Sequence, residues 1–227
     1  MHSEAGFQIM EDSIGLSGEL LQIARYILAG GVAAVPTETV YGLLADASSL
    51  NALDQLRALK GKPSSSPVPI FVPPNLPLRS LTSDPNDILM LLEKAYWPGP
   101  LLIVCEPSGV VANLPVCRQG LVGLRKSSSR IVNNLIELTG KFITATSANR
   151  FGNRPALNED DVKREFDASD LFIMDKPADS ITADRPSTVI TSEKGQLFIL
   201  REGAISADEI ARKLAESGFT LGIKKVG

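Results

Sequence analysis

Apolar positions along the chain form helical stripes that alternate with short continuous runs. The first stripe has the spacing of an amphipathic helix over residues 20–28 and stops at the Gly30-Gly31 pair. The next apolar run, Val32 to Val35, is continuous and is followed by Pro36, which predicts a short strand buried on both faces. The pattern therefore predicts a helix that leads into a buried strand.

The same two signals recur toward the C-terminus. Helices are predicted over 49–60, over 84–95 with Asp84 and Pro85 as N-cap and first turn, and over 131–138. Capping-box spacings mark two later helices, after Asn158 and Ser206. Short apolar runs predict strands at 101–105, 121–125, 142–146, 187–191 and 197–200.

The alternation of these elements bears on domain organisation. The chain shows no internal repeat, no low-complexity tract and no obvious flexible linker. We therefore expect one α/β domain over 16–218, with an N-terminal extension at 1–15 and a C-terminal tail at 219–227.

The junction after the first strand is rich in polar groups. Thr37, Glu38, Thr39 and Tyr41 follow Pro36 closely, and open α/β sheets bind ligands where strands lead into loops. The segment equally fits a capped connection from strand to helix in which Glu38 and Thr39 are solvated. Its own residues leave both interpretations open.

Composition narrows the possible chemistry. The formal net charge of −3 gives no global attraction for polyanions, so a nucleotide or RNA site requires a local cluster of Lys and Arg. His2 is the only histidine, which argues against Ser-His-Asp hydrolysis and a two-histidine centre, and no metal-ligating residues are predicted. Cys105 and Cys117 form neither a CxxC pair nor a disulfide framework. Without a signal-peptide core or a membrane-spanning run, we expect a cytoplasmic protein that does not enter membranes.

Two lysines could bind an anionic ligand. Lys60 and Lys62 lie at the end of the second predicted helix, next to the hydroxyls of residues 64–66. Such a turn is suited to phosphate, because ammonium groups balance its charge and hydroxyls supply directional hydrogen bonds. Lysines at a helix C-terminus also complement the helix dipole, so a purely structural role stays open. Neither a Walker A pattern nor GxGxxG is present.

Two arginines end predicted apolar strands. Arg125 and Arg201 each need an anionic partner or water at such a position. A ligand and a structural ion pair explain either arginine equally well. The hydroxyl and amide side chains beside other strands could bind a ligand or cap turns: Ser147, Asn149, Ser187 and Thr188.

Taken together and in this order, these segments resemble the YrdC-type L-threonylcarbamoyladenylate synthase family over roughly residues 16–206. The combination of PTETVYGL, WPGP and SAN is highly specific. The matching motifs are PTETVYGL at 36–43, the K-x-basic-P element at 60–63, WPGP at 97–100, VGLR at 122–125, TSAN at 146–149, ST at 187–188 and LREGAIS at 200–206.

The resemblance implies a fold and an activity. The fold is a single-domain, YrdC-like α/β fold: a twisted mixed parallel and antiparallel sheet with surrounding helices and a basic concave pocket. The activity is that of a nucleotidyltransferase that forms threonylcarbamoyl-AMP and pyrophosphate from L-threonine, bicarbonate or CO2, and ATP, with Mg²⁺ accompanying the ATP. The implied partners are threonylcarbamoyl-transfer proteins of tRNA modification, with tRNA or double-stranded RNA as a further ligand. Positioning and charge neutralisation can supply this catalysis without histidine.

The resemblance also implies the site residues, position by position. The catalytic residues are Lys60, Lys62, Ser147 and Asn149. The threonine-binding residues are Thr37, Arg125, Thr188 and Phe71. The ATP-binding residues are Lys60, Lys62, Ser66, Ser147, Ser187 and Arg201.

Several positions depart from the family pattern. Lys62 replaces an arginine, Ser66 an asparagine, and Phe71 a histidine that contacts threonine; Ala156 replaces a common serine, and residues 184–186 read Asp-Arg-Pro in place of Gly-Val-Glu. Either Arg185 and the hydroxyls of residues 64–66 compensate, or the chain is a divergent paralogue that binds RNA or nucleotide without threonine-dependent synthase activity.

Overall fold

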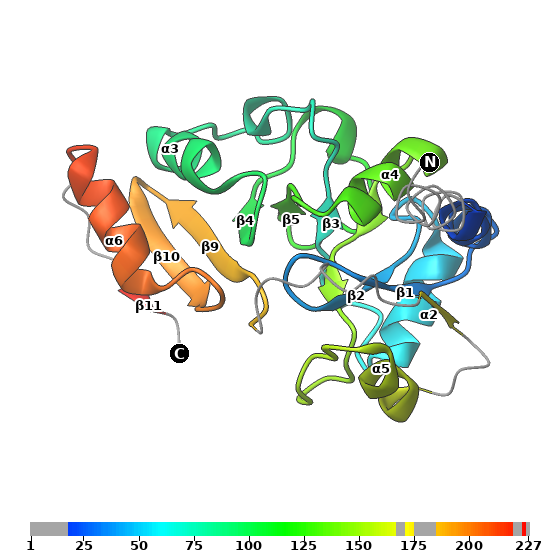
Figure 1. Ribbon diagram of the computed structural model, residues 1–227. Helices are drawn as coiled ribbons and strands as arrows, with labels where there is room; N and C mark the ends of the chain where they lie inside the picture. The colour runs from blue at the N-terminus through cyan, green and yellow to red at the C-terminus, as the bar shows by residue number, and fades with distance from the viewer. Residues whose placement is uncertain (1–17, 167–170, 175–184, 220–223, 226–227) are drawn as a thin grey trace, which may run out of the picture.

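The fold is built on two mixed β-sheets flanked by helices (Figure 1). The computed structural model describes residues 18–166, 171–174, 185–219 and 224–225. One sheet has four strands and the other has seven, and both contain parallel and antiparallel pairs. The predicted mixed α/β fold is confirmed, with its strands divided between two sheets.

The four-stranded sheet begins with a hairpin. β1 (Ala33–Pro36) pairs antiparallel with β2 (Tyr41–Leu44), and β1 also pairs parallel with a late strand. The strand order is β7-β2-β1-β8, completed by β7 (Thr146–Ser147) and β8 (Phe172–Ile173). The strand predicted at 32–35 is thus present, displaced by one residue.

A tight turn connects β1 to β2. The Thr37 hydroxyl donates to the carbonyl of Val40 at 2.7 Å, and the Val40 carbonyl also accepts from the Thr37 N–H at 3.3 Å. Glu38 and Thr39 within the turn are both buried. The interpretation as a strand-to-helix connection with solvated Glu38 and Thr39 is therefore wrong, because the chain reverses into a second strand.

The seven-stranded sheet gathers strands from the middle and the end of the chain in the order β11-β10-β9-β4-β5-β3-β6. β4 pairs antiparallel with β5 and parallel with β9. Part of the predicted C-terminal tail joins this sheet as β11. The strands are β3 (Ile70–Phe71), β4 (Leu101–Cys105), β5 (Val122–Arg125), β6 (Ile143–Thr144), β9 (Thr188–Glu193), β10 (Gln196–Arg201) and β11 (Lys224–Lys225).

The helices begin at polar caps. Asn158 and Ser206 cap two late helices as predicted. The prediction that Asp84 and Pro85 begin a helix is wrong, because the Asn86 side chain accepts from the Leu89 N–H at 3.1 Å and sets the cap two residues later. After a first helix at 18–28, the helices are α2 (Leu50–Leu59), α3 (Asp87–Tyr96), α4 (Arg130–Thr139), α5 (Glu159–Glu165) and α6 (Ala207–Glu216), with short 3-10 turns at Leu78–Ser80 and Gly109–Val111.

The chain crosses from one sheet to the other between β6 and β7. The predicted strand 142–146 is split there, because Thr144 pairs with β3 and Thr146 pairs with β2. Between them, the Ala145 N–H donates to the carbonyl of Pro69 at 2.7 Å. This crossing places β7 at the junction of the two sheets.

Two clusters of buried apolar side chains hold the helices against the sheets. The larger includes Leu53 of α2, Leu89 of α3 and Ile210 of α6. The smaller packs the first helix and α4 against β1 through Ile27 and Leu135. Figure 1 shows α6 beside β9 and β10 at one end of the molecule, and α2 beside β1 at the other. In the described part of the chain, no helix is long and apolar enough to cross a membrane.

A buried hydroxyl joins the start of β9 to the loop after β10. Thr188 Oγ1 accepts from the N–H groups of Gly203 and Ile205 at 2.9 and 3.0 Å, and donates to the Ile205 carbonyl at 2.5 Å. A Cβ atom at Gly203 would lie 2.1 Å from the Pro186 carbonyl oxygen, so only glycine allows this approach. Thr188 and Gly203 together fix this loop against β9.

The role of Thr188 gives a stability prediction. Thr188→Val should lower the free energy of unfolding by about 1–3 kcal/mol, because two buried N–H groups and a carbonyl lose their partner. Thr191→Val is the matched control on the same strand, since the half-buried Thr191 makes no side-chain hydrogen bond with the described residues; its effect should stay within about 0.5 kcal/mol. Urea denaturation followed by circular dichroism measures both, and equal effects would contradict this role.

Candidate functional site

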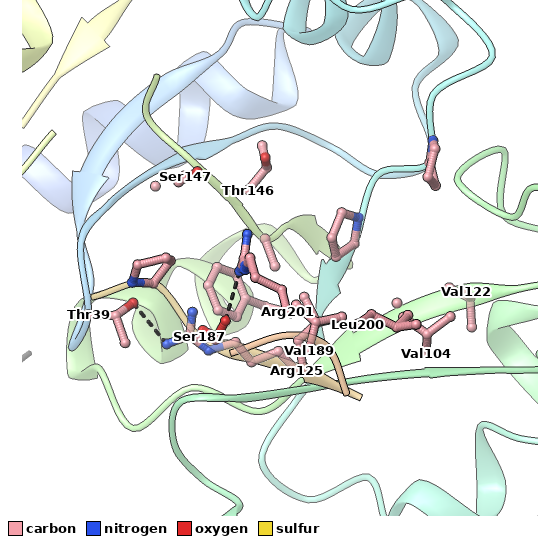
Figure 2. A pocket seen from close by; sticks show the side chains of 18 of the residues that line it. Thr39, Val104, Val122, Arg125, Thr146, Ser147, Ser187, Val189, Leu200 and Arg201 are labelled. Atoms are coloured by element: carbon pink, nitrogen blue, oxygen red, sulfur yellow. Dashed lines mark hydrogen bonds between the residues drawn. The ribbon is translucent and has the colours of Figure 1, made fainter. Parts of the chain in front are cut away.

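A cavity of about 440 Å³ lies between the two sheets (Figure 2). It is lined by the β1–β2 turn, by β7 and by residues of β3, β5, β9 and β10. Four predicted site residues lie outside its lining: Lys60, Ser66, Asn149 and Thr188. The other predicted site residues line it together: Thr37, Lys62, Phe71, Arg125, Ser147, Ser187 and Arg201.

The cavity has a cationic region and an apolar end. No Asp or Glu in the described part of the chain lines it, whereas Lys62, Arg118, Arg125 and Arg201 do. The resulting positive potential favours a polyanionic ligand. Figure 2 shows aliphatic side chains to one side of Arg125 and Arg201. They come from β4, β5, β9, β10 and the turn before β5: Leu102, Val104, Leu121, Val122, Val189 and Leu200.

A buried ion pair ties Arg125 to the β1–β2 turn. Arg125 Nη2 donates to Glu38 Oε1 at 2.7 Å and to Thr39 Oγ1 at 3.2 Å, the latter drawn in Figure 2. Arg125 Nε donates to the carbonyl of Gly99 at 3.2 Å. Nη1 makes no hydrogen bond with the described residues, so this amino group is available to a ligand. Arg125 therefore combines a structural ion pair with a place in the cavity lining.

The Glu38 carboxylate accepts hydrogen bonds from several donors. Besides Arg125, the hydroxyl of Ser127 donates to Oε2 at 2.6 Å and the N–H of Ser128 to Oε1 at 3.2 Å. Burial opposes ionisation, but Arg125 and the Ser127 hydroxyl outweigh it, and the pKa of Glu38 lies below its ordinary value. The carboxylate is therefore ionised at neutral pH and orients the guanidinium.

Phe71 lies against the guanidinium group of Arg125. The guanidinium carbon is 5.3 Å from the ring centroid, a cation–π contact. Only 1% of Phe71 is exposed, so the ring forms part of the wall beneath Arg125. The aromatic residue at this position thus supports the arginine.

Lys60 reaches β7 from the end of α2. Its Nζ donates to the carbonyls of Ser147 and Asn149, the latter at 2.9 Å. Burial, followed by the charges of Lys62 and Arg201, lowers the pKa of Lys60 to about 7. The ammonium group fixes the main chain that presents Ser147 to the cavity.

The two polar residues of the SAN motif are joined to each other. The Ser147 hydroxyl donates to Asn149 Oδ1 at 2.5 Å. Asn149 Nδ2 donates to the carbonyls of Arg150 and Asn153 at 2.8 and 3.0 Å. Asn149 therefore holds the following turn, while Ser147 lines the cavity.

Arg201 and Ser187 face the cavity from neighbouring segments. Arg201 Nη2 donates to the Ser187 carbonyl at 2.8 Å, a bond drawn in Figure 2. The Ser187 hydroxyl is buried and has no partner among the described residues. Burial lowers the pKa of Arg201, and burial together with the charge of Arg201 lowers the pKa of Lys62. A bound anion would relieve this concentration of positive charge.

Sequence reasoning missed other lining residues. Arg118 and Gln119 come from the loop 105–120, for which the sequence predicted no role. Of the hydroxyl-bearing residues 64–66, which were candidates for phosphate binding, Ser65 lines the cavity, whereas Ser66, the one assigned to ATP, does not. Gln119 has a φ of 52°, in the left-handed region that non-glycine residues rarely adopt. A loop has no regular spacing of apolar residues, so the sequence does not indicate that Arg118 faces a cavity. The sequence likewise predicted no role for the loop 175–186. Its Pro186 lines the cavity, and residues 175–184 lie outside the described residues.

Comparisons with known proteins identify the family to which the chain is similar. Residues 25–203 match the Sua5/YciO/YrdC family model, described as "Telomere recombination". The threonylcarbamoyl-AMP synthases of Pyrococcus abyssi and Bacillus subtilis are 32% and 30% identical over 85% of this chain, which spans 56% and 55% of their lengths. The chain thus spans about half the length of these two relatives. The threonylcarbamoyl-AMP synthase of Marinobacter nauticus is 31% identical over 83% of this chain and 100% of its own length.

Solved structures agree on the fold. P. abyssi Sua5 complexed with L-threonine matches with a TM-score of 0.76 and 29% identity, over 90% of this chain and 58% of that chain. Escherichia coli YciO, at 19% identity, shares the fold with a TM-score of 0.64 over 82% of this chain and 89% of its own. The family model covers most of the chain, and the residues that line the cavity lie within the matched range. This chain therefore belongs to the Sua5/YciO/YrdC family.

Proposed function

We propose that the cavity is the active site of a nucleotidyltransferase that forms threonylcarbamoyl-AMP and pyrophosphate from L-threonine, bicarbonate or CO2, and ATP. The observation that carries the proposal is the placement of Lys62, Arg125 and Arg201 around one cavity that no carboxylate of the described residues lines. The reaction must hold a carboxylate and a triphosphate together, and guanidinium and ammonium groups bind both. The similarity to threonylcarbamoyl-AMP synthases supports the same activity.

The proposed chemistry depends on positioning. The threonine amine adds to CO2 and loses a proton to solvent, which gives a carbamate. A carbamate oxygen then attacks the α-phosphorus of ATP, the bond from this phosphorus to the bridging oxygen breaks, and pyrophosphate leaves. Arg125 Nη1 holds the threonine carboxylate, and Lys62 with Arg201 neutralises the phosphates. Thr37, whose hydroxyl donates to the Val40 carbonyl and accepts from the Thr39 N–H, lines the cavity on the proposed threonine side.

Several predicted residues act in this proposal by positioning others. Lys60 and Asn149 lie outside the lining and fix the main chain on either side of Ser147. Thr188 fixes the loop after Arg201. These three residues keep the cavity wall in place without contact with substrate.

Mg²⁺ accompanies ATP in the proposal without protein ligands of its own. Mg²⁺ is commonly held by one or two carboxylates together with substrate phosphates, and no Asp or Glu of the described residues lines the cavity. The residues present therefore do not fit a protein-bound Mg²⁺, and no step is assigned to it.

The paralogue hypothesis depended on Phe71, Lys62 and Ser66. Phe71 supports Arg125 from within the wall, and Lys62 lines the cavity as a phosphate ligand would. The placement of Phe71 favours the synthase, because it supports the proposed threonine ligand, whereas a phosphate ligand at Lys62 suits both hypotheses. We further propose that the product passes, in the cytoplasm, to threonylcarbamoyl-transfer proteins of tRNA modification. Binding of tRNA or double-stranded RNA stays a prediction.

The proposed activity has a direct assay. The purified protein should release pyrophosphate only when ATP, L-threonine and bicarbonate are all present. Arg201→Ala should reduce the release by about 10- to 100-fold at low ATP, because a phosphate loses a charged donor. Arg130→Ala, on the exposed start of α4 outside the cavity, is the matched control and should have no effect. Release that is equal without threonine would contradict the synthase and favour the paralogue.

The Glu38–Arg125 pair predicts a selective effect on threonine. Glu38→Gln should weaken threonine binding by about tenfold or more and ATP binding much less, since an amide holds the guanidinium without charge. Calorimetry with each substrate measures this difference. Because Glu38→Gln also removes a buried charge, Ser127→Ala is the milder variant, and it should shift threonine binding in the same direction. Equal losses for ATP and threonine in both variants would contradict the assignment.

The Glu38–Arg125 pair should also make the stability of the fold depend on pH in the acidic range. The pKa of Glu38 is lower in the folded protein than its ordinary 4.5, so the folded protein binds fewer protons than the unfolded chain around that pH. The stabilising contribution is therefore complete above pH 4.5 and is lost as the pH falls through the lower folded value. Stability curves of wild type and Glu38→Gln should converge in strong acid, and a constant difference down to pH 2 would refute this.

Lys60 predicts a pH dependence of ATP binding. Its pKa of about 7 means that the charged form decreases about tenfold per pH unit above neutrality. Since a nearby triphosphate favours the charged form, ATP affinity should fall as the pH rises from 7.5 to 9, by at most about tenfold per unit. Lys60→Met should bind ATP more weakly at pH 7.5 and lose this part of the slope. An identical slope in both proteins would exclude Lys60 as its origin.

A further inference from the structure

Phe151 is the most exposed large apolar side chain of the described residues. Its side chain belongs to the turn that follows the SAN motif, and 72% of the residue is accessible to solvent. A single exposed apolar residue is common on protein surfaces, so the role of this ring has to be argued from its surroundings. Neither the core nor the proposed reaction uses the ring.

The turn that carries Phe151 is firmly held. The Asn153 N–H donates to the Arg150 carbonyl at 3.1 Å, and Gly152 has a φ of 90°, so Phe151 occupies the second position of a four-residue turn. The Phe151 N–H donates to the carbonyl of Lys60 at 2.8 Å. Asn149 Nδ2 ties the carbonyls at both ends of the turn.

A carboxylate of α5 holds the turn from its other side. Glu165 Oε1 accepts from the Arg150 N–H at 2.6 Å and from Asn153 Nδ2 at 2.8 Å. The ring is therefore presented in a fixed place, so a ligand that binds it does not have to order the loop first.

The ring lies beside the cationic part of the cavity. Lys62 Nζ is 5.2 Å from the ring centroid, and Lys62 also lines the cavity. Because Lys62 stands over one face of the ring and the residue is largely exposed, the opposite face is open to a flat partner. A ligand that reaches both Lys62 and this face carries negative charge and an aromatic ring close to each other. A nucleotide has both.

We propose that Phe151 is a stacking platform for the base of a nucleotide whose phosphates occupy the cationic part of the cavity. The inference rests on the proposed function, which places the phosphates at Lys62 and Arg201. Lys62 then bridges the two parts of the site, with its charge toward the phosphates and against one face of the ring. Stacking of a base on an aromatic side chain needs no hydrogen-bond readout, so base identity should matter little at Phe151.

A second place for the base exists at the apolar end of the cavity. Leu102, Val104 and Leu200 form an aliphatic surface there, on β4 and β10. An aliphatic surface lacks a π face, and the cation beside the Phe151 ring has no counterpart among these three side chains. The observations therefore favour Phe151, and the two places predict different mutant phenotypes.

The test compares ATP with inorganic tripolyphosphate, which has the phosphates but no base. Dissociation constants are measured by calorimetry on the full chain for wild type, Phe151→Ala, Phe151→Trp, Leu200→Ala and the control Leu138→Ala. Phe151→Ala should weaken ATP by roughly 5- to 100-fold and leave tripolyphosphate within about twofold. Phe151→Trp should retain ATP affinity, and its indole fluorescence should change on ATP binding but not on tripolyphosphate binding. Leu200→Ala tests the apolar end of the cavity. Leu138→Ala, which shortens an exposed apolar side chain of α4 outside the cavity, is the matched control and should change neither constant.

Other outcomes overturn the proposal. Equal weakening of ATP and tripolyphosphate by Phe151→Ala would mean that the ring acts only through the position of Lys62. Unchanged ATP affinity in Phe151→Ala together with weaker ATP binding in Leu200→Ala would place the base at the apolar end. Unchanged affinity in both variants would exclude Phe151 as a base contact.

A failure of the proposed function can be distinguished from a failure of the Phe151 proposal. Wild-type protein that binds ATP but releases no pyrophosphate with threonine and bicarbonate would contradict the synthase, while the comparison of ATP with tripolyphosphate would still decide the role of Phe151. Threonine-dependent release by wild type, combined with unchanged ATP affinity in Phe151→Ala, would support the synthase and overturn the platform.

Discussion

The buried ion pair between Glu38 and Arg125 connects the two sheets at the cavity. Glu38 comes from the β1–β2 turn and Arg125 from the end of β5, which belong to different sheets. Burying two charges is costly unless they are paired and their remaining hydrogen-bonding groups are satisfied. The side chains of Ser127 and Thr39 and the carbonyl of Gly99 supply such partners. The ion pair thus ties the two sheets together at the cavity and sets the orientation of the guanidinium.

A second set of polar residues supports the cavity wall from outside the lining. Lys60 and Asn149, which were predicted to be catalytic, lie outside the cavity lining and hold the main chain around β7 and the turn after it. Ser147 and Phe151 lie on the segments that these two residues fix. Polar side chains outside a cavity can therefore position those that line it, because preorganised donors act only where the backbone that carries them is held in place.

The accuracy of the sequence predictions follows the range of the interactions involved. The strand at 101–105 and the caps of α5 and α6 were predicted correctly, since apolar runs and side-chain caps act within a few residues. The start of α3 was wrong because Asp84 and Asn86 are both good caps, and only the fold selects between them. No local sequence pattern indicates the split of strand 142–146, because the chain passes there from one sheet to the other.

The sequence by itself determined the family, the α/β class and the set of residue types available for chemistry: cations and hydroxyls at strand ends, with a single histidine at residue 2. Only the tertiary structure decided which of these groups face the cavity, that Lys62 lines it while Lys60 does not, and that Phe151 is exposed beside it. It also decided the partner of Arg125, which the sequence left open among 26 acidic residues. The reason is physical: the pair joins residues 87 positions apart, and no local pattern specifies a contact that forms only when two sheets pack together.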